Sequence, residues 1–220
     1  MTFFVKICLD FSEIWLKSQL KKADMFKNGF VVTGSIGSGK STFVNLLKNA
    51  GFSVIDADLI SHEMLENSQN EVIKKFGSHI LQNGKISRKK LGAIVFNDKA
   101  KLKELEKILH PKISAKIAMQ SEILEQQKKP FFVDIPLFFE GLGEKNFDKI
   151  IVVYAPENLL IERVMKRNDL DYETAQSRVQ LQIDIEIKKQ MADFVIDNSG
   201  DLENLKQQTQ EFLKNIKENL

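Results

Sequence analysis

Cysteine is nearly absent from this chain, in which Cys8 is the single example. One thiol excludes a disulfide within the chain and a metal site built from several cysteines. Long apolar runs are missing too, because no stretch approaches the roughly 20 residues that span a membrane. Charged residues interrupt the apolar N-terminal segment, which argues against a signal-peptide core there. We therefore expect a cytoplasmic protein with no membrane partner.

An excess of charge of one sign is also lacking. The formal net charge is +2, and the pairs of lysines are spread along the whole chain. Proteins that bind nucleic acid usually concentrate positive charge on one face or element, so we expect no nucleic-acid partner. Hydrophobic residues make up 43% and charged residues 28%, as in ordinary globular domains. A chain of 220 residues suffices for one α/β domain, or for a core with a smaller insertion.

Five short apolar runs have the pattern of buried strands in a parallel sheet. They occupy residues 30–33, 53–55, 131–134, 150–154 and 194–196. A helical pattern that ends at Gly51 joins the first two, so these form a strand–helix–strand unit. We expect a core built from residues 28–58, 130–155 and 192–220, the last part being an amphipathic helix capped by Asp201.

Helical patterns dominate the two segments between the core pieces. Residues 59–129 form a charged helical insertion, with breaks expected at Gly77, Asn83-Gly84 and His110-Pro111. Residues 156–191 should hold two helices, one after Pro156 and one beginning near Asp171. Residues 1–24 precede the core of the domain (25–220) without a strand pattern. They are either an appended helix or a product of start-site choice.

The chemistry is carried by a motif that directly follows the first predicted strand. Its residues are Gly34, Ser35, Ile36, Gly37, Ser38, Gly39, Lys40 and Ser41, which match the P-loop pattern, and Thr42 follows. Glycines let the backbone wrap around phosphate oxygens, and the N-terminus of the next helix adds positive charge. Lys40 then reaches the β- and γ-phosphates of ATP, and the Ser41 hydroxyl takes a Mg²⁺ position. The alternative is an ordinary glycine-rich turn between a strand and a helix, and the apolar strand before and amphipathic helix after the motif favour the P-loop.

Carboxylates end the second and third predicted strands. Asp56 and Asp58 follow residues 53–55, where one can accept a proton from an attacking hydroxyl and the other can cap the next helix. Spacing alone does not separate these roles. Asp134 ends the third strand and can hold Mg²⁺, or else only polarise the strand end before Pro136. We predict Ser41 and Asp134 as the metal ligands.

Arginine is scarce, with four residues among 32 basic side chains. Arg163 and Arg167 are four residues apart and share a helix face, so they can close over a phosphoryl group in transfer. A solvated face paired to Glu162 or Asp169 is the alternative. His110 either touches a substrate or is structural, and His62 and His79 show no partners in the sequence. The phenylalanine pairs at 131–132 and 138–139 are expected in the core rather than stacked on a base.

In this order, the motifs resemble the dephospho-coenzyme A kinase family. The resemblance runs from about residue 30 to 200 and is carried by the P-loop and by segments 54–58, 108–111, 134–140, 163–167 and 192–200. It implies an α/β fold: a three-layer P-loop NTPase with a five-stranded parallel sheet, an inserted helical substrate domain and a helical lid. It also implies ATP and Mg²⁺ as cofactors and transfer to the 3′-hydroxyl of dephospho-coenzyme A.

The resemblance assigns roles to individual residues. Asp58 matches the position of the proposed base, which acts as a base or only positions the hydroxyl. Arg163 and Arg167 match lid arginines, and Asn198 matches a position beside the adenine of ATP. Arg88 and His110 are expected to bind the acceptor. We expect a monomer or weak homo-oligomer, and residues 1–24 have no counterpart in the family pattern.

Two other functions remain open at this point. The first is a small-molecule P-loop kinase acting on a nucleoside or nucleoside monophosphate. The second is a nucleotide switch, although the sequence has no N-K-x-D motif and no D-x-x-G spacing after Asp134. The acceptor that is phosphorylated separates these readings.

Overall fold

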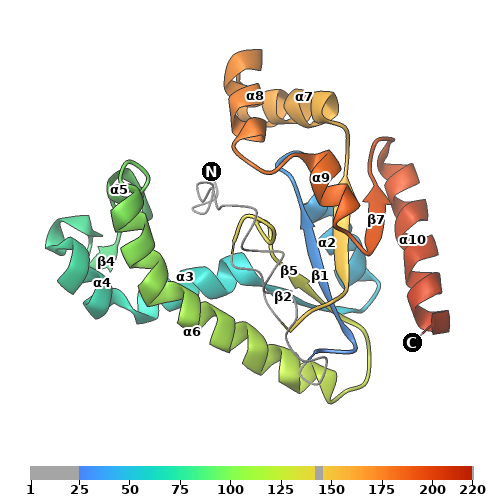
Figure 1. Cartoon of the computed structure of the whole chain (residues 1–220), viewed down its shortest axis with the longest axis horizontal. Helices are drawn as coiled ribbons and strands as arrows, with labels where there is room; N and C mark the ends of the chain where they lie inside the picture. Colours follow the sequence, from blue (N-terminus) through green and yellow to red (C-terminus); the bar gives the residue numbers. More distant parts are fainter. Residues whose placement is uncertain (1–24, 142–145, 220) are drawn as a thin grey trace.

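The structure, a computed structural model, describes residues 25–141 and 146–219. Its centre is a five-stranded parallel sheet with strand order β2-β5-β1-β6-β7 (Figure 1). The strands are β1 (Gly29–Gly34), β2 (Ser53–Asp56), β5 (Phe131–Asp134), β6 (Ile150–Tyr154) and β7 (Phe194–Asp197). The five predicted strands and the α/β fold class are thus confirmed, whereas the extension predicted at residues 1–24 lies outside the described residues.

Alternating side chains of the sheet build two apolar layers. Phe30 and Val32 of β1 point to one face, where they pack with Phe43 of α2 (Lys40–Asn49) and Phe212 of α10 (Leu202–Asn219). Val31 points to the other face and joins a larger cluster. Successive strand residues face opposite sides, so each face of the sheet receives its own helical cover. This gives the three layers that the sequence predicted.

The segment between β2 and β5 is mainly helical, as expected. Its elements are α3 (Ala57–Asn67), α4 (Gln69–Phe76), η2 (Ser78–Ile80), β3 (Leu81–Gln82), β4 (Lys85–Ile86), α5 (Arg88–Val95) and α6 (Lys99–Glu125). Asn83 and Gly84 have φ values of 52° and 75° and join β3 to β4 in a short hairpin. Such positive φ values are what an Asn-Gly hairpin turn requires. The insertion extends to the left of the sheet in Figure 1.

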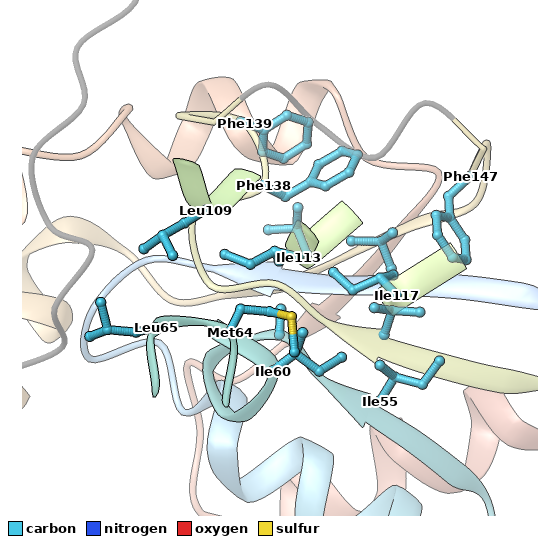
Figure 2. Packing of buried hydrophobic residues seen from close by; sticks show 14 of the residues in the cluster. Ile55, Ile60, Met64, Leu65, Leu109, Ile113, Ile117, Phe138, Phe139 and Phe147 are labelled. Atoms are coloured by element: carbon cyan, nitrogen blue, oxygen red, sulfur yellow. The ribbon is translucent and has the colours of Figure 1, made fainter. Parts of the chain in front are cut away.

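The predicted break at His110-Pro111 is wrong, because both residues lie inside the 27-residue helix α6. Proline removes one backbone donor from a helix interior, a cost that usually ends a helix. Here Leu109, Ile113 and Ile117 form a buried stripe on α6 (Figure 2). Burial of this stripe sustains the helix through Pro111, since tertiary packing supplies most helix stability in proteins.

The stripe on α6 packs between α3 and the loop that follows β5. Figure 2 shows Ile113 and Ile117 with Phe138 on one side and Met64 of α3 on the other. Phe138 and Phe139 are buried, and their ring centroids are 5.3 Å apart. Phe131 and Phe132 are buried in β5 as well. The prediction that these phenylalanines are core residues is therefore confirmed.

Three helices, rather than the two expected, connect β6 to β7. The predicted pair is α7 (Glu157–Asn168) and α8 (Tyr172–Gln180), and both lie at the top of Figure 1. The additional helix is α9 (Ile185–Gln190), whose six residues are too short for a helical period to stand out. None of the helices in the described ranges is both long and apolar enough to cross a membrane.

Candidate active site

The P-loop joins β1 to α2 and has the conformation of an anion cradle. Gly37 and Gly39 have φ values of 83° and 87°, in the left-handed region that favours glycine. Gly39 precedes α2 at its N-terminus, and no side chain among the described residues caps that helix. Uncapped N–H groups of a first helical turn bind anions, and the helix dipole adds positive charge there. Ser41 and Thr42 in this turn are exposed, as a binding role requires.

The hydroxyl groups of Ser35 and Ser38 are buried within the same loop. Neither hydroxyl oxygen has a hydrogen-bond partner among the described residues. The backbone N–H of Ile36 donates to the Gln182 side chain at 2.8 Å, which ties the loop between α8 and α9 to the P-loop. Gln182 could not be predicted as a P-loop contact, because no local pattern connects residues 146 positions apart.

Lys40 and Asp134 form an ion pair at the edge of the sheet. Lys40 starts α2 and Asp134 ends β5, next to β1. Burial raises the pKa of the Asp134 carboxyl group, while the Lys40 ammonium group lowers it. The ammonium group therefore stabilises the carboxylate form in a site from which water is largely removed. This pairing brings together a predicted phosphate ligand and a predicted metal ligand.

Asp56 and Asp58 have different tasks, as the sequence allowed. Asp56 is the N-cap of α3, and its carboxylate accepts a hydrogen bond of 3.0 Å from the N–H of Leu59. Asp58 is in the first turn of α3, so the helix begins two residues earlier than expected. Asp56 and Asp134 are directly opposite in the register of β2 and β5. Asp58 is thus free of the capping role and lies at the same edge as Lys40 and Asp134.

Electrostatics set the protonation of Asp58. Burial is the main cause that raises its pKa, and the negative charges of Asp56 and Asp134 raise it further. Lys40 and His62 act in the opposite sense. A carboxylate with a raised pKa accepts protons more readily, which suits a group facing an acceptor hydroxyl.

Asn198 contacts the P-loop from the end of β7, whereas Asp134 contacts it from the end of β5. Asn198 follows β7, is buried, and its side-chain nitrogen donates a hydrogen bond of 2.7 Å to the Ser38 carbonyl oxygen. Its backbone N–H donates to the Tyr154 carbonyl oxygen at 2.8 Å. The predicted cofactor-binding residue is therefore packed against the phosphate loop itself.

The two predicted lid arginines have different surroundings. Arg163 donates from Nη2 to the Asn198 carbonyl oxygen at 2.9 Å and from Nη1 to the Gly37 carbonyl oxygen at 3.4 Å. Arg167 is exposed and donates to its neighbour Asn168 at 3.2 Å. In the described part of the chain, neither arginine forms an ion pair with Glu162 or Asp169, which was the alternative. Arg163 thus contacts the P-loop, whereas Arg167 faces solvent.

The insertion contributes the remaining predicted residues. His110 is half-buried on α6, and burial lowers its pKa. We find no hydrogen bond from His110 to the P-loop or to Asp58 within the described ranges. Arg88 begins α5, and its Nη1 lies 2.6 Å from Nε2 of His62 on α3. This partner of His62 could not be predicted from the sequence, because Arg88 is 26 residues away in the chain.

The donor set matches a Mg²⁺ ion that arrives with a nucleotide. Ser41 offers an exposed hydroxyl at the start of α2, and Asp134 offers a buried carboxylate. No group of three or more histidine, cysteine, aspartate or glutamate side chains in the described residues is placed to hold a metal alone. Mg²⁺ usually binds through one or two protein oxygens together with substrate phosphates. Ser41 and Asp134 meet that description.

The fold and the site together define a class of protein. A parallel sheet, a P-loop opening onto α2 and a carboxylate at the end of a neighbouring strand form the nucleotide site of a P-loop kinase. The chain belongs to the dephospho-CoA kinase family, because the model of that family matches residues 30–204.

Individual relatives agree with this assignment. A dephospho-CoA kinase from Helicobacter pylori (strain J99) is 41% identical over 194 residues, which cover 87% of this chain and 99% of the relative. The solved structure of a dephospho-CoA kinase from Campylobacter jejuni is 43% identical, covers 87% of this chain and 98% of its own, and has a TM-score of 0.64. A solved Thermus thermophilus structure is 34% identical and covers 85% of this chain and 96% of its own, with a TM-score of 0.73.

Proposed function

We propose that this chain transfers the γ-phosphate of ATP to the 3′-hydroxyl of the ribose of dephospho-CoA, giving CoA and ADP. The observation that carries the proposal is the contact between Lys40 and Asp134, beside Asp58, at the edge of the sheet where the P-loop opens. In this proposal Lys40 is the phosphate-binding cation and Asp58 is the proton-accepting carboxylate. Membership of the dephospho-CoA kinase family names the acceptor.

The residues divide the work of an in-line displacement. The P-loop backbone and Lys40 hold the β- and γ-phosphates, while Asp58 orients the acceptor hydroxyl and accepts its proton. Arg163 and Arg167 neutralise the negative charge of the phosphoryl group in transfer. Asn198 supports the P-loop on the nucleotide side through its contact with Ser38.

Mg²⁺ bound with ATP supplies charge neutralisation at the β- and γ-phosphates. Ser41 and Asp134 are the residues of this chain that would hold it. In the structure, the Asp134 carboxylate forms an ion pair with Lys40. The Asp134 carboxylate would be available to Mg²⁺ if Lys40 bound the phosphates instead.

The remaining parts of the chain serve the two substrates. We propose that residues 59–129 form the acceptor-binding domain, with Arg88 and His110 as substrate contacts, and that residues 156–191 form the lid. The long helix α6 packs on α3, which carries Asp58, so the insertion and the reacting edge are joined. We further propose a cytoplasmic enzyme that works as a monomer or weak homo-oligomer.

The test is an assay of ADP release with Mg-ATP and purified protein. Dephospho-CoA, adenosine, AMP and no acceptor are compared, and the product is identified by mass spectrometry. Release only with dephospho-CoA, together with a product heavier by one phosphoryl group, is the expected result. Release with AMP or adenosine would keep the P-loop kinase but reject the acceptor. Release without any acceptor would indicate hydrolysis and reject phosphoryl transfer to this substrate.

A further inference from the structure

The side chains of His62 and Arg88 meet one helical turn away from Asp58. Asp58 and His62 are four residues apart on α3, so they lie on the same face, separated by about 6 Å along the axis. His62 is close enough to lower the pKa of Asp58 slightly by its charge. Arg88 reaches this face from the start of α5, with Nη1 2.6 Å from Nε2 and 3.3 Å from Nδ1 of His62.

Arg88 and His62 have further N–H donors besides those used in their mutual contact. A guanidinium group only donates, so the ring nitrogen that it contacts must accept, and the other ring nitrogen of neutral His62 keeps its N–H. Arg88 is exposed, and no carboxylate of the described residues forms an ion pair with it. The exposed Arg88 and the half-buried His62 therefore bring a positive fork and an imidazole ring together, which is a combination suited to phosphate oxygens.

The negative charge of the acceptor lies on the 5′-diphosphate, which is close to the 3′-hydroxyl. In dephospho-CoA the 3′-hydroxyl and the 5′-diphosphate stand on one ribose, linked through C4′ and C5′. A hydroxyl at Asp58 therefore brings the diphosphate close to the face of α3 that His62 occupies.

We propose that His62 and Arg88 bind the 5′-diphosphate of the acceptor while its 3′-hydroxyl lies at Asp58. This inference rests on the proposed function and adds to it the residues that distinguish dephospho-CoA from a nucleoside. Adenosine carries the same hydroxyl without the diphosphate, so the pair gives no advantage to adenosine.

Steady-state kinetics test the proposal with dephospho-CoA varied at saturating Mg-ATP. For His62→Ala and Arg88→Ala we expect the KM for dephospho-CoA to rise roughly 10- to 100-fold, as for a lost charge-assisted hydrogen bond. The kcat value and the KM for ATP should change little, because the pair binds substrate and transition state alike. Arg88→Lys keeps the charge but loses the fork, so it should give an intermediate KM.

Two matched controls come from the same part of the chain. Lys89→Ala removes an exposed cation next to Arg88, and His79→Ala removes an exposed imidazole from η2. Both should leave the KM for dephospho-CoA unchanged. Adenosine, used as a competitive inhibitor against dephospho-CoA, should bind His62→Ala, Arg88→Ala and the unchanged protein equally well.

The possible failures are distinct. If the unchanged protein phosphorylates dephospho-CoA and both variants keep its KM, the diphosphate assignment is wrong and the proposed function stands. A fall in kcat at constant KM would instead mean that the pair only holds α3 in place, which also overturns the assignment. If the unchanged protein does not use dephospho-CoA at all, the proposed function and this inference fall together.

Discussion

The side-chain nitrogen of Asn198 donates a 2.7 Å hydrogen bond to the carbonyl oxygen of Ser38, so the end of β7 is fastened to the P-loop. The next residue, Gly39, has a φ of 87°, and a Cβ on it would lie 2.0 Å from that same nitrogen. Position 39 therefore requires glycine for two reasons: its backbone is left-handed, and there is no room for a Cβ atom. The conformation of the phosphate cradle depends on both.

We expect Gly39→Ala to lose ATP binding and stability. The left-handed backbone costs about 1–2 kcal/mol for a residue with a Cβ, and the contact with Asn198 adds to this. Gly51 provides a matched control, since its φ is also 87° but a Cβ there meets nothing within 4 Å. Urea unfolding and the KM for ATP measure both effects. Equal losses for Gly39→Ala and Gly51→Ala would show that the contact with Asn198 is unimportant.

The pH at which kcat falls on the acid side (the acid limb of the pH profile) should depend on Asp56. The pKa of Asp58 is raised by burial and by the charges of Asp56 and Asp134, so kcat should fall with decreasing pH sooner than for an ordinary aspartate. Asp56→Asn removes a negative charge that raises this pKa and should move the limb to lower pH. Asparagine still caps α3, so the helix persists.

A helix N-cap far from Asp58 provides the control for this experiment. Asp98 caps α6 by accepting hydrogen bonds from the N–H groups of Ala100 and Lys101, at 2.9 and 3.2 Å. Asp98→Asn therefore makes the same chemical change at a helix N-terminus in the insertion. It should leave the acid limb of kcat where it is. A limb that stays in place for Asp56→Asn as well would contradict the assigned electrostatics.

Asp58→Asn should lower activity and raise stability together. Its proton-accepting role predicts a kcat lower by about 10²- to 10⁴-fold with the KM for ATP retained. The raised pKa means that the folded protein binds the Asp58 proton more tightly than the unfolded chain, so stability is lost as pH rises from the unfolded pKa to the higher folded pKa. Asparagine carries no charge to bury, so Asp58→Asn should be more stable than the unchanged protein at pH 7. The difference in unfolding temperature between the two proteins, measured at pH 7 and at pH 4, should be smaller at pH 4. An unchanged kcat would remove Asp58 from the mechanism.

Much of the core could be predicted from the sequence, because its elements are defined by local patterns. The run at residues 30–33 is a buried strand, and the P-loop motif fixes the turn and helix that follow it. The division of labour between Asp56 and Asp58 was open, because either carboxylate can cap a helix from this spacing. Only the hydrogen bond from Leu59 to Asp56 decides it.

Features that depend on distant partners could not be predicted. Pro111 suggests a helix end locally, but burial of the stripe around it on α6 outweighs the lost hydrogen bond. The contact of His62 with Arg88, and that of Gln182 with Ile36, join segments with no shared pattern. Helix α9 is too short for its period to be recognised, and its place is set by contacts with the sheet.

The lid arginines should separate in their effects on stability. Arg163 bridges the carbonyl oxygens of Asn198 and Gly37, so Arg163→Ala should lower both kcat and the unfolding temperature. Arg167 is exposed, so Arg167→Ala should lower kcat about 10-fold or more without affecting unfolding. Lys166, also exposed, lies between them and serves as the control, with no change expected for Lys166→Ala. A normal kcat for Arg167→Ala would exclude it from the transfer step.

The last prediction concerns the buried ion pair of Glu140 and Lys188. Lys188 Nζ lies 2.5 Å from Glu140 Oε1, and both side chains are almost fully buried, with exposures of 0% and 6%. The same oxygen accepts a hydrogen bond of 3.1 Å from the N–H of Ile183. The pair thus joins the loop after β5 to the segment that leads into α9. Lys188→Met should cost about 3–5 kcal/mol, because it leaves a carboxylate buried without a counter-charge.

Urea unfolding across pH tests this mechanism, because a lone buried carboxylate gains stability by taking up a proton. Lys188→Met should recover stability as pH falls, and Lys188→Met with Glu140→Gln should recover most of it at pH 7, since glutamine still accepts from Ile183. Lys206→Met removes the exposed pair with Glu203 and should change unfolding by only a few tenths of a kcal/mol. If Lys188→Met and Lys206→Met lose equally little, water reaches Glu140, and the pair is not the dry link between β5 and α9 that its burial indicates.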